Sequence, residues 1–317
     1  MTATPQRRAL LTSAFFLILA TVLWMGRSPG PTVHPVRPLA PGGALPAGGT
    51  SAGRATEAPS GIVVVHALHN DVSAPLRALP PLSAVPGEAI TPPREFPVPV
   101  RGPREQASGR DGALQPRPSG PADAEMPAPL LNFAGVGNLS GVDPPDTNGD
   151  VGPNHYIQWI NFYFQIFDKA GASIYGPAQG RTLWAGFGGR CEASNHGDPI
   201  VLYDGQADRW FLSQFSYRFV TGAYTFRQCI AVSTSPDPLG SYNRYDFEIS
   251  TTQFNDYPKF GVWPDGYYAT YNMYNPDTFA YLGPRAVVFD RVRMLAGQPV
   301  TMQYVQLSPP NYSLLPA

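Results

Sequence analysis

The apolar and polar positions divide the chain into three unequal parts. An uncharged run from Ala9 to Met25 comes first, and residues 28–130 then contain little apolar bulk. From residue 131 onward, short runs of aromatic and aliphatic residues are separated by Asn, Asp, Gly and Pro. Short alternating runs bounded by such residues are typical of strands and turns. We therefore predict a hydrophobic helix (residues 1–27), a linker (28–130) and an all-β domain (131–317).

The first segment has the charged start and the apolar middle of an export signal, because Arg7 and Arg8 precede the run. A spanning helix needs about 17 to 20 apolar residues, so residues 9–25 are also long enough for a retained membrane anchor. No small-x-small cleavage site follows Trp24 and Met25, which favours the anchor. The two arginines place the start in the cytoplasm and the rest outside. We expect an exported protein that is extracellular, on the cell surface or periplasmic.

The linker is defined by proline. Residues 28–130 hold 21 of the 37 prolines and one aromatic residue, Phe96. Such a composition cannot bury enough apolar surface to offset chain entropy, so we expect a disordered, extended tether. One exception is Ile62 to Leu68 (IVVVHAL). Its interpretation is open between a strand, a partner-binding segment and a β-prone patch of the linker.

A repeated unit occurs three times in the C-terminal domain. VGPNHYIQWIN at 151–161 aligns with VWPDGYYATYN at 262–272, and VLYDGQADRWFLSQF at 201–215 is a looser copy. A further strand follows each copy. Several strands per unit, repeated at this interval, are typical of propeller blades. We predict a partial β-propeller of about three four-stranded blades, with a β-sandwich as the alternative.

Propellers close with typically 4 to 8 blades. We therefore expect either a truncated copy of a longer protein or a homo-oligomer that completes the ring.

Four stretches resemble a known family: PPDTNGDVGPNHYIQW, GDPIVLYDGQADRWFLSQF, CIAVSTSPDPLGSYNRYDF and DYPKFGVWPDGYYATYN. Residues 131–310 are similar to large, mostly uncharacterised secreted bacterial β-propeller proteins, which continue through further blades. This resemblance implies a propeller and export. The family is distantly similar to sialidase-like propellers, but no residue here matches a sialidase Asp-box, so no catalytic residue is implied.

An acidic residue precedes the aromatic strand of every copy. Asp146, Asp198 and Asp256 lie at corresponding places, and His196 adjoins the second of them. In a propeller these carboxylates would surround one mouth, where they suit calcium, a sugar or the acid/base pair of glycoside hydrolysis. They are therefore candidates for ligand binding and, if the site is catalytic, for catalysis. The alternative is that they are ordinary turn residues.

The first unit contains a more specific pattern of oxygen ligands: Asp146, Asn148, Asp150 and Asn154. This spacing resembles the calcium loops of integrin-type propellers and predicts a calcium site. The pattern is not an EF-hand, because Val151 and Ile157 replace the required glycine and glutamate. The alternative is a turn without metal.

The cysteines and the tryptophan at position 184 give two further predictions about the domain. Cys191 and Cys229 are the only cysteines, and an even count in an exported domain predicts a disulfide, with two buried thiols as the alternative. Most of the aromatic residues are expected in the core. Glycines follow Trp184, so we expect this side chain in an exposed loop, where it would stack on a sugar ring.

Composition narrows the function. There are 22 basic and 23 acidic residues without a basic run, so nucleic acid is not an expected partner. Motifs of serine hydrolases, zinc proteases and P-loop proteins are absent from the sequence. We expect an exported binding module for a glycan or an extracellular protein, without chemistry of its own. The alternatives are a glycoside-hydrolase-like or sialidase-like enzyme and an inactive fragment.

Overall fold

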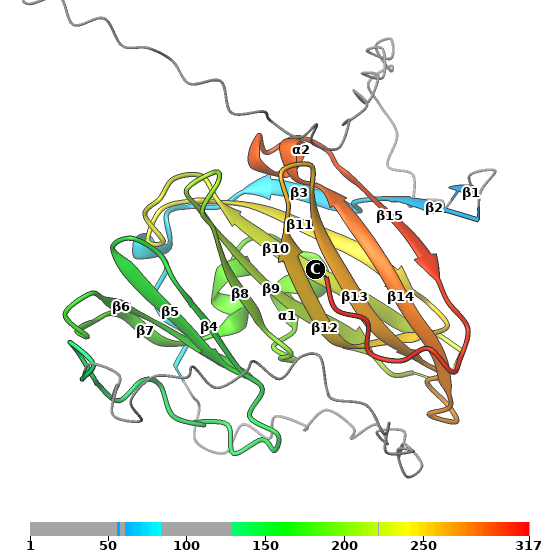
Figure 1. Ribbon diagram of the computed structural model, residues 1–317, viewed down its shortest axis with the longest axis horizontal. Coiled ribbons are helices and arrows are strands. Elements are labelled where there is room, and N and C mark those ends of the chain that lie inside the picture. The colour runs from blue at the N-terminus through cyan, green and yellow to red at the C-terminus, as the bar shows by residue number, and fades with distance from the viewer. Residues whose placement is uncertain (1–55, 58–60, 84–127, 221, 317) are drawn as a thin grey trace, which may run out of the picture. The chain divides into compact units, whose positions relative to one another are not determined.

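The computed structural model describes residues 56–57, 61–83, 128–220 and 222–316 (Figure 1). All of them belong to one compact unit. The predicted signal or anchor, residues 1–27, and most of the predicted linker lie outside the described residues. No helix in the described ranges combines the length and the apolarity that a bilayer span requires.

Three antiparallel sheets dominate the described structure, and each contains a four-stranded meander that we call a blade (Figure 1). Blade 1 consists of β4 (Thr147–Val151), β5 (His155–Ile160), β6 (Tyr163–Asp168) and β7 (Ser173–Gln179). Blade 2 consists of β8 (Ile200–Asp204), β9 (Arg209–Arg218), β10 (Thr225–Ser233) and β11 (Tyr242–Ser250). Blade 3 consists of β12 (Phe254–Val262), β13 (Gly266–Tyr274), β14 (Tyr281–Asp290) and β15 (Thr301–Gln306).

The first strand of each blade is its inner strand. β8 contacts both β4 and β12, so the inner strands of the three blades are neighbours, as they are around the axis of a propeller. The helical pieces are short: two 3₁₀ turns, η1 (Leu76–Ala78) and η2 (Gly180–Trp184), and two helices, α1 (Gly189–Ala193) and α2 (Arg291–Leu295). The predicted fold, an all-β partial propeller with three four-stranded blades, is confirmed.

Residues 61–83, which we assigned to the linker, form part of this domain, and we call them the strap. Its strands are β2 (Val63–His66) and β3 (His69–Val72), with β1 (Thr56–Glu57) paired to β2. β2 pairs with β15 of blade 3, and β3 pairs with β11 of blade 2. At blade 1, the amide of Gln179 donates to the carbonyl of Leu82.

The strap therefore runs along the outer edges of all three blades. The predicted domain boundary at residue 130 is wrong for residues 61–83, and the strand interpretation of Ile62–Leu68 is the one that the structure shows. An edge strand is stabilised by the unpaired backbone groups that it covers. These groups belong to strands far along the chain, so the local composition of the strap gave no sign of them.

Alternation of side chains along the strands builds the contacts between blades. In β5, Ile157 and Trp159 are buried in a core shared with Trp210 of blade 2. In β13, Tyr267 and Tyr271 belong to a second core, which blades 2 and 3 share. Successive residues of a strand point to opposite faces, so a period of two suffices to direct one face of each blade toward its neighbour.

Extended segments cover the other faces of blades 1 and 3. Near blade 3, the hydroxyl of Thr270 donates to the carbonyl of Leu314 at 2.6 Å. At blade 1, the amide of Val136 donates to Oε1 of Gln158 at 2.8 Å. The homo-oligomer that we expect stays a prediction.

Polar contacts also join the blades. Asp204, at the end of β8, is fully buried and accepts from Arg291 Nε at 2.7 Å and Nη2 at 2.9 Å. The hydroxyl of Tyr267 donates to the same carboxylate at 2.8 Å. Blades 2 and 3 are therefore held together by an ion pair inside the protein as well as by apolar packing.

Candidate functional site

The strand register shows which residues of the three blades are equivalent. Val151, Tyr203 and Val262 each pair with the conspicuous aromatic residue of the next strand. The residues five positions earlier are Asp146, Asp198 and Tyr257, and their φ angles are 44°, 44° and 54°. Aspartate is among the residues that adopt positive φ more readily than most. Two of the three carboxylates therefore start their inner strands at equivalent positions, and the third, Asp256, is displaced by one residue.

The three carboxyl groups lie close enough to perturb one another, and we call them the axial carboxylate cluster. Burial raises the pKa of Asp146, although Lys259 and a side-chain hydrogen bond with Asp198 act in the opposite direction. Burial, followed by the charges of Asp256 and Asp146, raises the pKa of Asp198 well above its ordinary value. Burial raises the pKa of Asp256 to about 6. The hydrogen bond between Asp146 and Asp198 means that this pair can share one proton.

Lys259 supplies the positive charge of the site. Burial lowers its pKa, whereas the charges of Asp198, Asp146 and Asp256 raise it. Its Nζ lies 3.8 Å from the ring centroid of Tyr257, a cation–π distance. Sequence reasoning missed this residue, although it is one of only two lysines in the chain.

A small pocket opens at the cluster, and we call it the axial pocket. Its volume is about 80 Å³, and a water molecule occupies about 30 Å³ in the liquid. The pocket can therefore admit a few hydroxyl-sized groups rather than a whole sugar ring. Its lining consists of Asp146, Thr147, Asn148, Asp198, Pro199, Ile200, Tyr257, Pro258 and Lys259.

Two more residues that the sequence did not indicate support the cluster. Asn161 is fully buried and donates from Nδ2 to Oδ2 of Asp146 at 3.0 Å. Tyr217 lies near Asp198 and Asp256, since their charges add to the effect of burial in raising its pKa. The backbone amide of Tyr257 donates to Oδ2 of Asp198 at 3.3 Å. Asn161 of blade 1 and Tyr257 of blade 3 thus position two of the carboxyl groups by hydrogen bonds.

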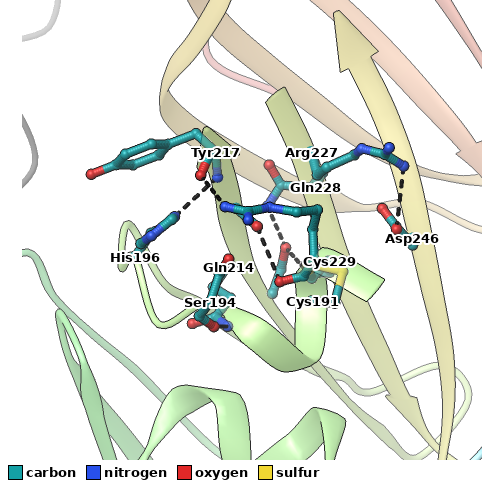
Figure 2. Close-up of a disulfide and its surroundings, with 12 residues drawn as sticks. Cys191, Ser194, His196, Gln214, Tyr217, Arg227, Gln228, Cys229 and Asp246 are labelled. Atoms are coloured by element: carbon teal, nitrogen blue, oxygen red, sulfur yellow. Dashed lines mark hydrogen bonds and ion pairs between the residues drawn. A yellow bond between two sulfur atoms is a disulfide. The ribbon is translucent and has the colours of Figure 1, made fainter. Parts of the chain in front are cut away.

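His196 has a different place from the one we predicted. Figure 2 shows it beside Tyr217, whose backbone amide donates to its Nδ1 at 3.0 Å. The two rings stack with centroids 4.0 Å apart. Burial and the charge of Arg190 lower the pKa of His196 to about 4. His196 does not line the axial pocket, so the direct ligand contact we predicted is wrong. The histidine is neutral and positions Tyr217.

Trp184 is fully buried. It packs in the core between blades 1 and 2, so the prediction that it stacks on a ligand from an exposed loop is wrong. Gly186, Gly188 and Gly189 have φ angles of 74°, 78° and 66°. They turn the chain back after Trp184, because glycine adopts such angles without steric cost. The glycines therefore mark a tight turn rather than exposure of the neighbouring ring.

The predicted calcium site is wrong as a set of four ligands. Residues 147–151 form the extended strand β4, and Asn154 follows its far end. A strand rises about 3.3 Å per residue, so Asp146 and Asn154 are too far apart for ligands 2.3–2.6 Å from one ion. Asn148 and Asp150 instead accept from the backbone amides of Val201 at 2.8 Å and Tyr203 at 2.7 Å. The two side chains thus accept hydrogen bonds from backbone amides on the edge of β8 that faces blade 1, and they join blade 1 to blade 2.

The predicted disulfide between Cys191 and Cys229 is present, with a Cα–Cα distance of 5.7 Å (Figure 2). It ties α1 to β10, and both cysteines are fully buried. The segment from η2 to α1 enters blade 2 beside the cluster. The disulfide therefore anchors to β10 the segment that leads into the inner strand of blade 2.

Comparisons with known proteins add little. No protein-family model matches the chain, and no curated protein matches it. A solved structure of an exo-1,5-alpha-L-arabinanase from a bovine ruminal metagenomic library is similar, with 15% identity and a TM-score of 0.33. The match covers 49% of this chain and 55% of that chain, so this chain spans about half the length of that structure.

Proposed function

We propose that this chain is an exported β-propeller module that binds a glycan through the axial carboxylate cluster. The observation that supports this function best is a cluster of three carboxyl groups, from three blades, beside one polar pocket; Asp146 and Asp198 line this pocket, and Asp256 adjoins its lining residue Tyr257 in the chain. Burial raises the pKa of all three groups, and repulsion by neighbouring carboxylates adds to it for Asp198 and Asp256, so the arrangement destabilises the folded protein at neutral pH. If these residues served only to form turns, short polar side chains without a charge would suffice. Perturbed carboxyl groups that gather in a pocket are typical of functional sites.

The chemistry of the pocket suits sugar hydroxyl groups. Ionised carboxylates accept hydrogen bonds from hydroxyls, and Lys259 can donate to a hydroxyl oxygen. The ammonium group also provides the positive charge that a bound cation would otherwise provide. Calcium stays a predicted cofactor, and we expect any effect of calcium to be smaller than the effect of the carboxylates.

The test is a calorimetric titration of the full chain with a panel of neutral and acidic oligosaccharides. We expect Asp198→Asn and Asp256→Asn each to weaken binding at least about tenfold, because each removes a carboxyl group of the cluster that hydrogen-bonds the sugar hydroxyls. Asp265→Asn is the matched control, since Asp265 is exposed in the turn at the opposite end of β12. Equal binding by all three variants, or no binding by the wild type, would refute the proposal. Repeating the titration in EDTA and in calcium chloride tests the metal.

A second function is glycoside hydrolysis, and the raised pKa of Asp256 favours it. A general acid works best with a pKa near the working pH, and the value of about 6 meets this condition. Glycosidases separate their two carboxyl groups by about 5 to 9.5 Å. Asp256, whose pKa is nearest the working pH, would be one member of the pair, with Asp146 or Asp198 as the other.

Release of reducing ends from the bound oligosaccharides, followed between pH 4 and pH 8, tests the second function. Hydrolysis by the wild type that Asp256→Asn abolishes would establish it. Binding without any release of reducing ends would leave the module as a glycan-binding protein.

A further inference from the structure

Three arginines gather at the end of blade 2 that lies beside the axial carboxylate cluster, and we call them the arginine cluster. Arg218 ends β9, Arg227 lies on β10 and Arg190 lies on α1. In the register of β9 and β10, Arg218 pairs with Thr225 and Ser216 pairs with Arg227. Paired residues and their neighbours two positions away share a face, so Arg218 and Arg227 project from the same side of the blade.

The three guanidinium groups differ in whether a carboxylate neutralises their charge. Asp246 and Glu248 both pair with Arg227, each at 3.3 Å. Within the described residues, no salt bridge involves Arg190 or Arg218. Arg190 donates from Nη2 to the carbonyl of Tyr217 at 2.6 Å, which fixes its position without neutralising it. One fixed and one exposed positive charge therefore lack a carboxylate partner.

Two donors of the arginine cluster also lack an acceptor. The Nε groups of Arg190 and Arg227 are buried and have no hydrogen-bond partner. Burial, followed by the charges of Arg218 and Arg227, lowers the pKa of Arg190, although Asp246 acts in the opposite direction. Like charges and unsatisfied donors both destabilise a fold. A bound anion beside the guanidinium groups would relieve the repulsion between the like charges.

The arginine cluster adjoins the axial pocket through Tyr217 and His196. Arg190 acts on His196, whose ring stacks on Tyr217, and Tyr217 in turn lies near Asp198 and Asp256. Figure 2 shows Tyr217, His196 and Arg227 around the same end of β9 and β10. The arginine cluster and the axial carboxylate cluster therefore lie at the same end of blade 2.

We propose that Arg190, Arg218 and Arg227 form a subsite for an anionic group, a carboxylate or a sulfate, of an acidic glycan. Hydroxyl groups of the neighbouring sugar of the same glycan would enter the axial pocket, so this inference rests on the proposed function. Guanidinium groups suit such anions, because their planar arrangement of donors matches the oxygens of carboxylate and sulfate. Arg227 keeps its two carboxylate partners, while Arg190 and Arg218 provide the free charge.

The test compares two oligosaccharides that differ only in charge: a tetramer of 1,4-linked galacturonate and its methyl ester. We expect the full chain to bind the acid about tenfold more tightly than the ester, and added salt to reduce this preference. Arg190→Gln and Arg218→Gln should each remove most of the preference. Arg293→Gln is the matched control, because Arg293 is exposed on α2 at the opposite end of the blades. Its substitution should leave the preference unchanged.

A second measurement separates this inference from the proposed function. Sodium sulfate and sodium acetate are titrated into ¹⁵N-labelled protein while the arginine Nε–H signals are followed. Saturable shifts of signals that disappear in Arg190→Gln or Arg218→Gln would support the subsite and show which anion it prefers. Absence of saturable shifts would overturn it, whatever the glycan results. Equal affinity for the acid and the ester would overturn the subsite but leave the proposed function standing, whereas binding of neither would refute the proposed function.

Discussion

Replacing Asp256 with Asn should stabilise the domain at neutral pH, although it removes a charged residue of the axial carboxylate cluster. Asparagine has nearly the same shape, so the substitution changes charge more than packing. The pKa of Asp256 is raised from 3.8 to about 6, and one pKa unit corresponds to 1.36 kcal/mol. The upper bound for the stabilisation is therefore about 3 kcal/mol. Because the side chain is partly exposed and its titration is shared with Asp146, we expect about 1 to 3 kcal/mol.

The sign follows from proton binding. A carboxyl group with a raised pKa binds protons more tightly in the folded state, so its contribution to stability is complete below about pH 4 and is lost as the pH rises through 6. His196, with its pKa lowered to about 4, has the opposite dependence, and stability rises with pH between about 4 and 6.5. His196 contributes equally to the variant and to the wild type, so its contribution cancels when their free energies of unfolding are subtracted at each pH. We expect this difference to be near zero at pH 4 and largest at pH 7.5.

Urea unfolding of the full chain, followed by tryptophan fluorescence at several pH values, measures this difference, because Trp159, Trp184 and Trp210 are all buried. Asp150→Asn is the matched control. Asp150 accepts from the amide of Tyr203, so its substitution should lower the free energy of unfolding by about 0.5 to 1 kcal/mol. A loss of stability for Asp256→Asn at pH 7.5 would refute the reasoning and support a plain turn role for the residue.

Three further predictions concern the framework, and urea unfolding measures each. Replacing Cys191 and Cys229 with serine should lower the free energy of unfolding by about 4 kcal/mol, the chain-entropy value for a separation of 38 residues; an unchanged midpoint would contradict it. Arg291→Met should cost about 3 to 5 kcal/mol, because it leaves the charge of Asp204 buried and unpaired; the additional change Asp204→Asn should recover part of this loss, and no recovery would count against the ion pair. Val65→Ala in the strap should cost about 2 kcal/mol, since the side chain is buried in the core of blades 2 and 3; an unaffected midpoint would mean that the strap is dispensable.

The features that the sequence could predict are those encoded within one repeat. The blades follow from short alternating runs and Asx turns. In one such turn, Oδ1 of Asp168 accepts from the amides of Ala170 and Ala172. Asp146 and Asp198 were found because equivalent positions of a repeat meet at one place in a propeller. The disulfide was found from the number and compartment of the cysteines.

The features that were missed depend on contacts between distant parts of the chain. The strap has an unremarkable local composition, and only the edges of β11 and β15 make it a pair of strands. Trp184 was predicted to be exposed because glycine permits both mobile loops and tight turns, and sequence alone does not distinguish them. Lys259 becomes important only where the inner strands of three blades meet, and no local pattern signals that meeting.

The strap also has a consequence for the order of folding. Asn70 donates a hydrogen bond to the carbonyl of Gly297, 227 residues further along the chain. During synthesis, residues 61–83 leave the ribosome long before β15 exists, so the edge of β2 that pairs with β15 stays open until that strand has been made. Pairings of such high sequence separation slow folding, and an unpaired apolar strand invites aggregation in the meantime. Closing the strap is therefore expected to be the last step of folding, and a nascent chain that stalls before residue 301 would expose VVVH as an open strand.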